Sequence, residues 1–461
     1  MIAFAPLLAL ALHAAATPPL VTPRFDRMAK EAREILAELV AVDTTNPPGN
    51  EAQAVALLAH RLQKAGIAHE VTTFESGRDN LVARVRGDGT RKPLLLLAHL
   101  DVVGTQGQRW SVPAHALTEK GGYLYGRGVG DDLGMAAVDL ALALELSRSQ
   151  ATLHRDLIVA FTGDEESGGA GMRWLLAHKP ESIDAEVAFN EGGGPLLRDD
   201  GQIELIELQT AEKIYQDFSM TSVGTTGHSS VPLPDNAILA LSRALLALAS
   251  EPFPDRLIPV TRAYFAGRAP FEPGALGVAM AKIASADGPL PADALAAVRE
   301  RPSLDVQLHT TCVATLVSGG TRVNALPASA EANVNCRILP DETIGSVQAR
   351  LQRLAGTQAT LTAVRDFGGS APAPLDGPGP AAVLAASRAL YPGVTMVPIM
   401  SAGADDSRFL RQAGIRAYGF APLALTEADS RRAHGIDERI AVSSLRSGVE
   451  LFYDLVQALN R

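Results

Sequence analysis

The sequence predicts an α/β fold, and two kinds of segment support this prediction. Residues 94–98 and 157–161 are unbroken apolar runs, typical of strands that are buried on both faces. Residues 135–146, between them, form an apolar segment of helical length, so strands and helices alternate along the chain. Because ligands collect where the parallel strands of such a sheet end, the residues directly after the strands are the first candidates for chemistry.

Two adjacent carboxylates, Glu165 and Glu166, follow the second apolar run in the glycine-flanked segment 162–168. Two neighbouring anions repel each other unless a cation or a proton separates their roles. One carboxylate on a metal ion and the other free to act as a general base would satisfy this condition. An isolated acidic pair after a strand is more often a solvated turn, so the hypothesis depends on the rest of the chain.

Further histidine and acidic side chains occupy similar positions. His99 follows the first apolar run, and Asp101 points to the same face of a strand, where its carboxylate can fix the tautomer of a metal-bound imidazole. Asp131 lies in a glycine-rich turn before the helical segment, Glu191 follows another short apolar run, and His434 is isolated near the C-terminus. Each could be a capping carboxylate or a surface histidine, but together they favour a single site.

The order of these motifs resembles that of the M20 metallopeptidases. The motifs His-x-Asp, Gly-Arg-Gly-x-x-Asp-Asp, Asp-Glu-Glu, Asn-Glu-Gly-Gly and a late histidine span nearly the whole chain. That family includes glutamate carboxypeptidase, succinyl-diaminopimelate desuccinylase, aminoacylase and carboxypeptidase S. By this resemblance, two zinc ions, with cobalt or manganese as alternatives, are bound by His99, Asp131, Glu166, Glu191 and His434. The resemblance also implies that Glu165 is the general base, that Asp101 orients His99, and that the peptide bond between Asp131 and Asp132 is cis.

The resemblance implies hydrolysis of an amide or peptide bond by a metal-activated water, with Glu165 taking its proton. Glu191, where some members have aspartate, favours a carboxypeptidase or an N-acyl-amino-acid hydrolase that acts on small peptides or acylated amino acids. A dipeptidase or aminopeptidase of the same family is the near alternative, and a non-catalytic peptide-binding relative is the distant one. The sequence contains no Gly-x-Ser-x-Gly elbow and no His-Glu-x-x-His helix.

The family is built as one domain inserted into another, and the residue pattern permits this architecture. We expect a dinuclear-zinc exopeptidase domain in two parts, 17–212 and 367–461. Between them, at 213–366, we expect an α+β domain of the ferredoxin-like type that forms a lid and makes the protein a homodimer. The expected elements of this insert are strands at 214–223 and around 312–338, and helices at 236–249 and 345–354. Residues 252–303 exceed what a minimal insert needs, and we assign them no function.

Four further residues are expected at the substrate by the same resemblance. His228, in a Gly-His-Ser-Ser segment, matches a histidine that reaches across the dimer and stabilises the developing oxyanion. Asn324 and Arg337 match substrate-contacting positions, and a guanidinium suits a substrate carboxylate. Gly403 belongs to the glycine-rich substrate loop, in which two alanines here replace a glycine and a hydroxyl residue, so the hydroxyl contact of that loop is not expected.

Composition and charge restrict the possible partners and the compartment. The 461 residues are 47% hydrophobic, as in a soluble globular protein, and a net charge of −10 argues against nucleic acid or an anionic membrane surface as a partner. Residues 1–16 have the pattern of a secretory signal peptide, so we expect a periplasmic or secreted protein without stable membrane insertion after cleavage. Because this segment lacks lysine and arginine, an uncleaved N-terminal anchor is the alternative.

The chain has two cysteines, Cys312 and Cys336, in segments that read as strands. If the two strands are neighbours in an exported protein, the cysteines could form a disulfide. The alternative is a pair of buried thiols that act as small apolar residues. Because there is no third cysteine, a zinc–cysteine site is not expected.

Overall fold

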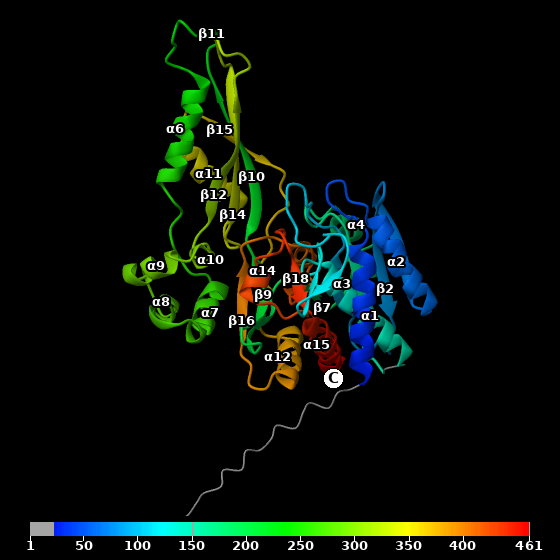
Figure 1. Ribbon diagram of the computed structural model, residues 1–461. Coiled ribbons are helices and arrows are strands. Elements are labelled where there is room, and N and C mark those ends of the chain that lie inside the picture. Colours follow the sequence, from blue (N-terminus) through cyan, green and yellow to red (C-terminus); the bar gives the residue numbers. More distant parts are fainter. Residues whose placement is uncertain (1–22, 150–151, 461) are drawn as a thin grey trace, which may run out of the picture.

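The computed structural model describes residues 23–149 and 152–460, and Figure 1 shows a rounded body from which an elongated arm projects. The predicted signal peptide at 1–16 lies outside the described residues. Within those residues, no helix is both long and apolar enough to cross a bilayer.

The body is built on one mixed sheet of nine strands. Its strands follow the order β1-β2-β6-β3-β7-β17-β9-β16, with β8 paired to β9, and β6, β3, β7 and β17 are parallel neighbours. The strands are β1 (Ala68–Glu75), β2 (Arg78–Val85), β3 (Leu94–His99), β6 (Leu157–Thr162), β7 (Val187–Asn190), β8 (Gly194–Leu197), β9 (Ile203–Glu212), β16 (Met396–Ser401) and β17 (Arg416–Gly419). The predicted α/β fold is therefore confirmed.

Helices cover both faces of this sheet, which explains why its central strands are continuous apolar runs. In β3, Leu94 and Leu96 pack into the core on one face, whereas Leu95 and Leu97 pack into the core on the other. The first core receives α1 (Pro23–Val40), α2 (Glu51–Lys64), α3 (Leu133–Arg148), α12 (Pro378–Leu390) and α15 (Val442–Asn460). The second core receives α4 (Ala170–His178), α5 (Pro180–Ile183) and α13 (Ser407–Gln412).

A small three-stranded sheet and a short helix complete the body beside the start of α3. They are β4 (Thr118–Lys120), β5 (Tyr123–Tyr125), β18 (Arg439–Ala441) and α14 (Glu427–Ser430). Since β18 pairs with β5, the C-terminal part of the chain is brought next to the turn that contains Asp131.

The arm is a four-stranded antiparallel sheet with helices on one face. The elements occur along the chain as β10 (Ile214–Val223), α6 (Ala237–Ser250), β12 (Thr311–Gly319), β14 (Ser329–Ile338), α11 (Ile344–Ala355) and β15 (Thr360–Val364). The strand order β12-β14-β10-β15 and the β-α-β-β-α-β sequence are those of a ferredoxin-like fold, as predicted. At the far end, β11 (Gly227–His228) pairs with β13 (Ala325–Leu326) (Figure 1).

Residues facing the two sides of the arm sheet differ in character. Along β10, Phe218 and Met220 are buried beneath α6 and α11, while Tyr215 and Asp217, which point to the other face, are only partly buried. One face is thus an apolar core and the other is polar. Cys312 and Cys336 are register partners on β12 and β14 and form a disulfide, which decides between the two alternatives that the sequence left open.

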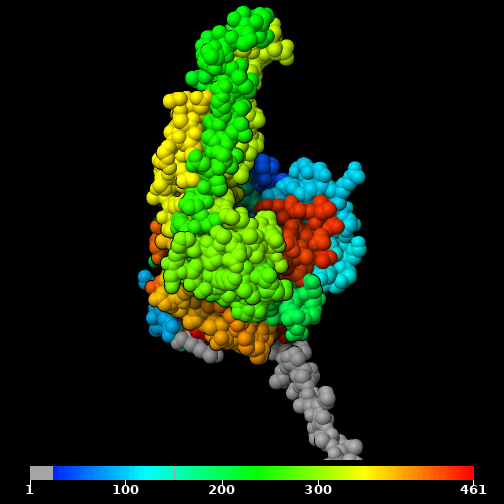
Figure 2. All heavy atoms as spheres, turned by 90° about the vertical axis from the view of Figure 1, so that its left-hand side faces the viewer, coloured from blue at the N-terminus to red at the C-terminus, as the bar shows by residue number. Residues whose placement is uncertain are grey.

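Residues 252–303, to which the sequence assigned no function, form most of a small helical unit between α6 and β12. Its helices are α7 (Pro259–Arg268), the 3₁₀-helix η1 (Ala269–Phe271), α8 (Gly274–Ala284), α9 (Ala292–Arg299) and α10 (Pro302–Asp305). Prolines at the first turn of α7 and α10 explain how a proline-rich segment becomes helical, because the missing N–H is not needed there. Phe265 and Met280 lie in its own core, and Figure 2 shows the unit at the foot of the arm.

Candidate metal centre and substrate cavity

The predicted site residues meet where the parallel strands of the body end. His99 is the last residue of β3, Glu165 and Glu166 lie in the turn after β6, and Glu191 directly follows β7. Since β6, β3 and β7 are adjacent and parallel, their carboxyl ends form one edge of the sheet.

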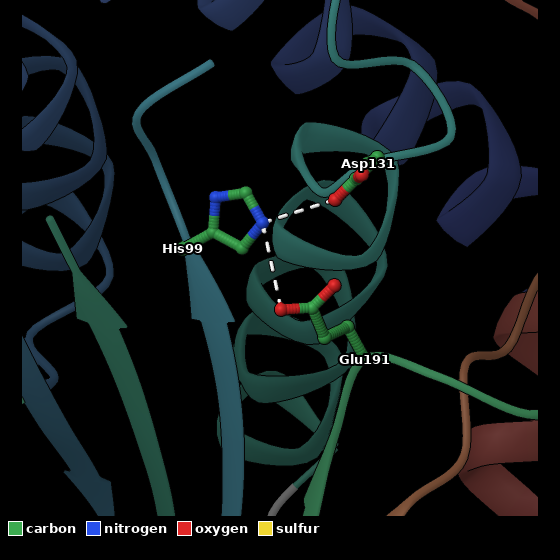
Figure 3. Close-up of side chains that lie close together, drawn as sticks. All are labelled: His99, Asp131 and Glu191. Atoms are coloured by element: carbon green, nitrogen blue, oxygen red, sulfur yellow. Dashed lines mark hydrogen bonds and ion pairs between the residues drawn. The ribbon is translucent and has the colours of Figure 1, made fainter. Parts of the chain in front are cut away.

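Two groups of three side chains share Asp131. In the first, His99 Nε2 lies 3.1 Å from Asp131 Oδ1 and 3.7 Å from Glu191 Oε1, and Figure 3 shows the three side chains pointing toward one another. In the second, His434 Nε2 lies 3.1 Å from Asp131 Oδ2 and 3.1 Å from Glu166 Oε2. In each group the ligand atoms lie within 4.8 Å of one another. The structure thus brings together all five predicted metal ligands, with Asp131 between two adjacent positions.

The turn that presents Asp131 is held from behind by Glu438. One carboxylate oxygen of Glu438 accepts hydrogen bonds from the backbone N–H of Gly130 at 2.8 Å and of Asp131 at 3.1 Å, and the other accepts from Gly128 at 3.0 Å. The peptide bond between Asp131 and Asp132 is cis, as the family resemblance implied. The hydrogen bonds to Glu438 thus hold the backbone of the turn that carries Asp131.

Asp101 supports both the histidine and the acidic pair, but with different atoms. Its backbone carbonyl lies 2.9 Å from His99 Nδ1, while its carboxylate Oδ1 is 3.7 Å away from that nitrogen. The carboxylate instead accepts hydrogen bonds from the backbone N–H of Glu165 and Glu166, each at 3.1 Å, and from Asn46 Nδ2 at 2.7 Å. The carbonyl can thus orient the imidazole, and the carboxylate fixes the turn that bears the two glutamates.

A buried ion-pair network holds the other side of the same turn. Arg78 donates to both carboxylate oxygens of Glu51, a residue with no exposed surface, and to Asp164 Oδ1 at 2.8 Å. Asp164 has a left-handed backbone (φ 70°), and its second carboxylate oxygen accepts from the N–H of Ala170 at 3.1 Å. Because Asp164 directly precedes Glu165, this network also holds the backbone of the acidic pair in place.

The crowding of carboxylates changes the protonation of the site. Burial raises the pKa of Glu165 and Glu191 well above their usual range, and the neighbouring negative charges add to this effect. Hydrogen bonds to Asp131 and Glu166 raise the pKa of His434 to about 10. Burial disfavours a charge on His99, but Glu191 and Asp131 outweigh it and raise the pKa of this histidine too. Such a site gains stability from any added positive charge.

The donor atoms fit two divalent cations. Glu166 Oε1 and Glu191 Oε1 are buried and have no hydrogen-bond partner among the described residues, a costly condition that a bound cation would relieve. Histidine nitrogen combined with carboxylate oxygen is a ligand set of zinc and of related divalent metals. The five ligands would hold the ions and leave Glu165 free.

A cavity of about 540 Å³ opens beside this centre, between the body and the arm. Glu165, Glu166 and His434 line it on the body side. Two of the predicted substrate residues, Arg337 and Gly403, also line it. The metal centre therefore faces a space large enough for a small peptide or an acylated amino acid.

His228 and Asn324 do not line this cavity. His228 is exposed on β11 at the far end of the arm, where its Nδ1 lies 2.7 Å from the hydroxyl of Ser230 (Figure 1). Asn324 is also exposed, and its backbone carbonyl accepts from the N–H of Ser229. Within one chain, the structure does not bring these two predicted residues to the metal centre.

Several residues that line the cavity belong to none of the motifs recognised in the sequence. Tyr215 and Asp217 come from the polar face of the arm, and Arg408 comes from the start of α13. Arg408 follows the glycine-rich loop that the sequence did single out, and the alternating polar residues of the 214–223 strand were a visible signal for the other two. Nothing in the local sequence shows that these residues converge.

A sheet edge that gathers two histidine–carboxylate groups around a free glutamate is the architecture of a metal-dependent hydrolase. The chain belongs to peptidase family M20/M25/M40, whose family model matches residues 95–458. It is 27% identical over 414 residues to the human N-fatty-acyl-amino acid synthase/hydrolase PM20D1, covering 85% of this chain and 78% of that protein. It is 26% identical over 385 residues to the probable carboxypeptidase S-like 2 of Dictyostelium discoideum, covering 80% and 72%.

The fold is shared with the M20 family metallo-carboxypeptidase Sso-CP2 from Sulfolobus solfataricus. The two structures superpose with a TM-score of 0.72 at 18% sequence identity, over 93% of this chain and 99% of that one. The predicted family and fold are thus confirmed, and the protein is a hydrolase of C–N bonds.

Proposed function

We propose that the protein is a zinc-dependent carboxypeptidase or N-acyl-amino-acid hydrolase that acts on small peptides or acylated amino acids. The observation that carries this proposal is the pair of ligand groups that share Asp131 beside Glu165. Among the described residues, no hydrogen bond or ion pair involves the Glu165 carboxylate, which lines the cavity. When bound, the two ions would lower the pKa of a water and polarise the amide carbonyl.

Glu165 is the proposed general base. Its backbone N–H is held by Asp101 at 3.1 Å, which fixes the turn that carries it, and burial raises its pKa, which increases the affinity of its carboxylate for a proton. It takes the proton of the attacking water and then gives it to the leaving nitrogen as the C–N bond breaks. No protein nucleophile is required for this reaction.

Two observations support a substrate with a free carboxylate. Arg337 lines the cavity from the arm, opposite the metal centre, and a guanidinium binds a carboxylate with two parallel hydrogen bonds. The relatives named above are a hydrolase of N-fatty-acyl amino acids and a carboxypeptidase S-like protein. Transferred to this chain, both names fit hydrolysis of an amide next to a carboxylate.

We further propose that the working form is a homodimer in which His228 serves the partner's site. The edge strand β12 exposes Val313, Leu316 and Val317 by 59–71%, and the adjoining helix α6 exposes Ile238 and Leu239. An unpaired strand edge flanked by apolar side chains favours pairing with a second copy. Such a dimer would give the exposed His228 a site to act on.

Export to the periplasm or to the medium is also a proposal. The disulfide between Cys312 and Cys336 supports it, because disulfides persist in oxidising compartments. If residues 1–16 are not cleaved, they would anchor the protein instead. Mass determination of the mature N-terminus from a cell fraction distinguishes the two outcomes.

Amine release from three substrate classes tests the proposed activity. The zinc-loaded protein would be incubated with N-acetylated amino acids, with short N-blocked peptides that have a free C-terminus, and with free-amine dipeptides. We expect hydrolysis of the first two classes and little of the third. Preferential cleavage of free-amine dipeptides would show a dipeptidase or aminopeptidase instead, and no cleavage of any class would contradict the proposal.

A further inference from the structure

Arg408 is an unusual feature of the cavity wall. It lies at the start of α13, lines the cavity, and is only 8% exposed. Its guanidinium carbon lies 4.5 Å from the ring centre of Phe409 and 5.6 Å from that of Phe367. The two rings are nearly perpendicular, at 88°, and contact with both restricts the guanidinium while leaving its N–H groups free to donate.

The charge of Arg408 is not neutralised by any direct contact. In the part of the chain that the structure describes, its side chain forms no hydrogen bond and no ion pair, and its buried Nε has no partner. Two acids are close enough for the charge of Arg408 to act on their pKa, in the lowering direction against the larger effect of burial, but neither forms an ion pair with it. Glu212 binds Arg411, and Asp406 accepts a hydrogen bond from the hydroxyl of Thr162 with one carboxylate oxygen, while its other oxygen has no partner among the described residues. A buried, unpaired cation is costly, so its retention indicates a ligand that pairs with it.

Arg337 is in a similar state on the opposite wall. It comes from strand β14 of the arm, and its guanidinium carbon lies 4.5 Å from the ring centre of Tyr215. Among the described residues it too has stacking but no hydrogen bond or ion pair. Burial lowers its pKa, and the positive charge of Arg408 contributes to the same shift, so the two arginines affect each other across the cavity.

We propose that Arg408 and Arg337 together bind the carboxylate of the substrate, one from the body and one from the arm, and that Arg408 is a specificity-determining residue. An anion between the two guanidinium groups relieves their mutual repulsion and pairs the unpartnered N–H groups. A neutral carboxamide in the same place would leave the buried Arg408 and the partly buried Arg337 unpaired. The inference rests on the proposed function, and it defines the substrate class as amides with a free carboxylate beside the scissile bond.

A pair of substrates that differ only in the carboxylate tests this role. The zinc-loaded protein and the Arg408→Gln variant would be assayed with N-acetyl-leucine and with N-acetyl-leucine amide. We expect the substitution to lower kcat/KM for the acid by at least about tenfold, mainly through KM, and to leave the amide nearly unchanged. Arg408→Lys, which keeps the charge but loses the planar fork, should give an intermediate loss.

Arg173→Gln is the matched control. Arg173 also stacks on Phe367, with its guanidinium carbon 5.0 Å from the ring centre, but it does not line the cavity. Its removal should leave the preference for the acid over the amide unchanged. Melting temperature and zinc content of each variant establish that it is folded and loaded.

The outcomes separate the inference from the proposed function. If Arg408→Gln lowers both substrates equally, or neither, the inference is wrong although the proposed function stands. If the unaltered protein hydrolyses neither compound, N-acetyl-leucine is not a substrate. Calorimetric measurement of the affinity of the zinc-loaded protein for the acid and for the amide then tests the inference. If the unaltered protein binds the acid and the amide with equal affinity, and Arg408→Lys does the same, the inference is wrong.

Discussion

At the scale of single residues, the adjacent glutamates have distinct surroundings. Glu166 lies 3.1 Å from His434 in a ligand group, whereas no hydrogen bond or ion pair to a described residue involves the carboxylate of Glu165. We therefore expect Glu165→Ala to lower kcat by about 10²–10⁴-fold, the usual effect of losing a general base, with both metal ions retained. Steady-state kinetics together with metal analysis of the same sample measures this.

Glu166→Ala provides the comparison, because it removes a ligand and should lower the metal content to about one ion per chain. A Glu165→Ala protein that has lost both ions would show that the two roles have been assigned the wrong way round.

A second residue-scale prediction concerns the support behind the acidic pair. Arg78 is 6% exposed and is the ion-pair partner of the fully buried Glu51. Arg78→Met would leave that carboxylate buried and unpaired, so we expect the free energy of unfolding to fall by about 3–5 kcal/mol in urea titrations. Arg86→Met is the control, since Arg86 pairs with Asp156 at the surface with 74% of its side chain exposed and should cost less than about 1 kcal/mol. Equal losses for the two variants would contradict the structural role of the network.

The sequence was sufficient to predict which histidine and acidic side chains gather at one site but not the walls of the cavity. His99 and Glu191 lie in short motifs at strand ends and Asp131 lies in a glycine-rich turn before a helix, so their type and position are visible without knowledge of the packing. Arg408 differs, because its significance comes from the rings of Phe367 and Phe409 and from the absence of an acidic partner among the described residues. Those are properties of tertiary contacts, which no local motif encodes.

At the scale of elements, the disulfide joins the edge strand β12 to the rest of the arm sheet. Cys312 and Cys336 are 24 residues apart, and closing a loop of this length removes conformational freedom from the unfolded chain. We expect the Cys312→Ala, Cys336→Ala double variant to be less stable by about 2–4 kcal/mol, as measured by chemical unfolding under oxidising conditions. Dithiothreitol should destabilise the unaltered protein but not the double variant. Equal sensitivity of both to the reductant would show that the stabilisation has another origin.

Elements with a simple apolar period were predictable, whereas the helical unit at the foot of the arm was not. The residues of α6 and α11 follow the amphipathic pattern of helices that cover one face of a sheet. In contrast, α7 is a short helix whose glycine at 267 packs against Val397 of β16, and Arg268 binds Glu204 and Glu272. Val397 and Glu204 are distant in sequence, so these stabilising contacts of α7 are not visible in the local sequence.

At the scale of the whole molecule, the metal centre should make stability depend on pH. The pKa of His434 is raised from 6.5 to about 10, so its stabilising effect is complete below about 6.5 and is lost as pH rises through 10. The raised pKa values of Glu165 and Glu191 act in the same direction, because the folded metal-free protein binds more protons than the unfolded chain. We therefore expect the melting temperature of the chelator-treated protein to fall between pH 6 and pH 9.

Zinc should reverse this trend, because it binds only the deprotonated ligands and only the folded site. The difference in melting temperature between zinc-loaded and metal-free protein should consequently widen as pH rises. If the difference in melting temperature between zinc-loaded and metal-free protein stays constant or becomes smaller from pH 6 to pH 9, the ionisable groups of the metal centre are not the cause of the pH dependence.

His228 lies far from the metal centre of its own chain, so its proposed role depends on a second chain. If His228 acts in the partner's site, a dimer of one His228→Ala chain and one Glu165→Ala chain contains one complete site, so mixing the two inactive variants should restore part of the activity. Distinguishable affinity tags allow the mixed dimer to be purified and assayed. A purified mixed dimer without activity above that of its parents would contradict action between chains.

The connection between the body and the arm has a mechanical consequence. Strand β9 ends at Glu212 and β10 begins at Ile214, so only Lys213 separates the two sheets. Lys213 is fully buried, and its ammonium group donates a hydrogen bond of 2.7 Å to the carbonyl of His309. The ten residues of β10 extend about 33 Å beyond this pivot. If the arm rotated by about 5° about this connection, its tip would move by about 3 Å, whereas the cavity next to the connection would change much less. A spectroscopic probe attached to the tip would consequently amplify any closure of the cavity around a substrate.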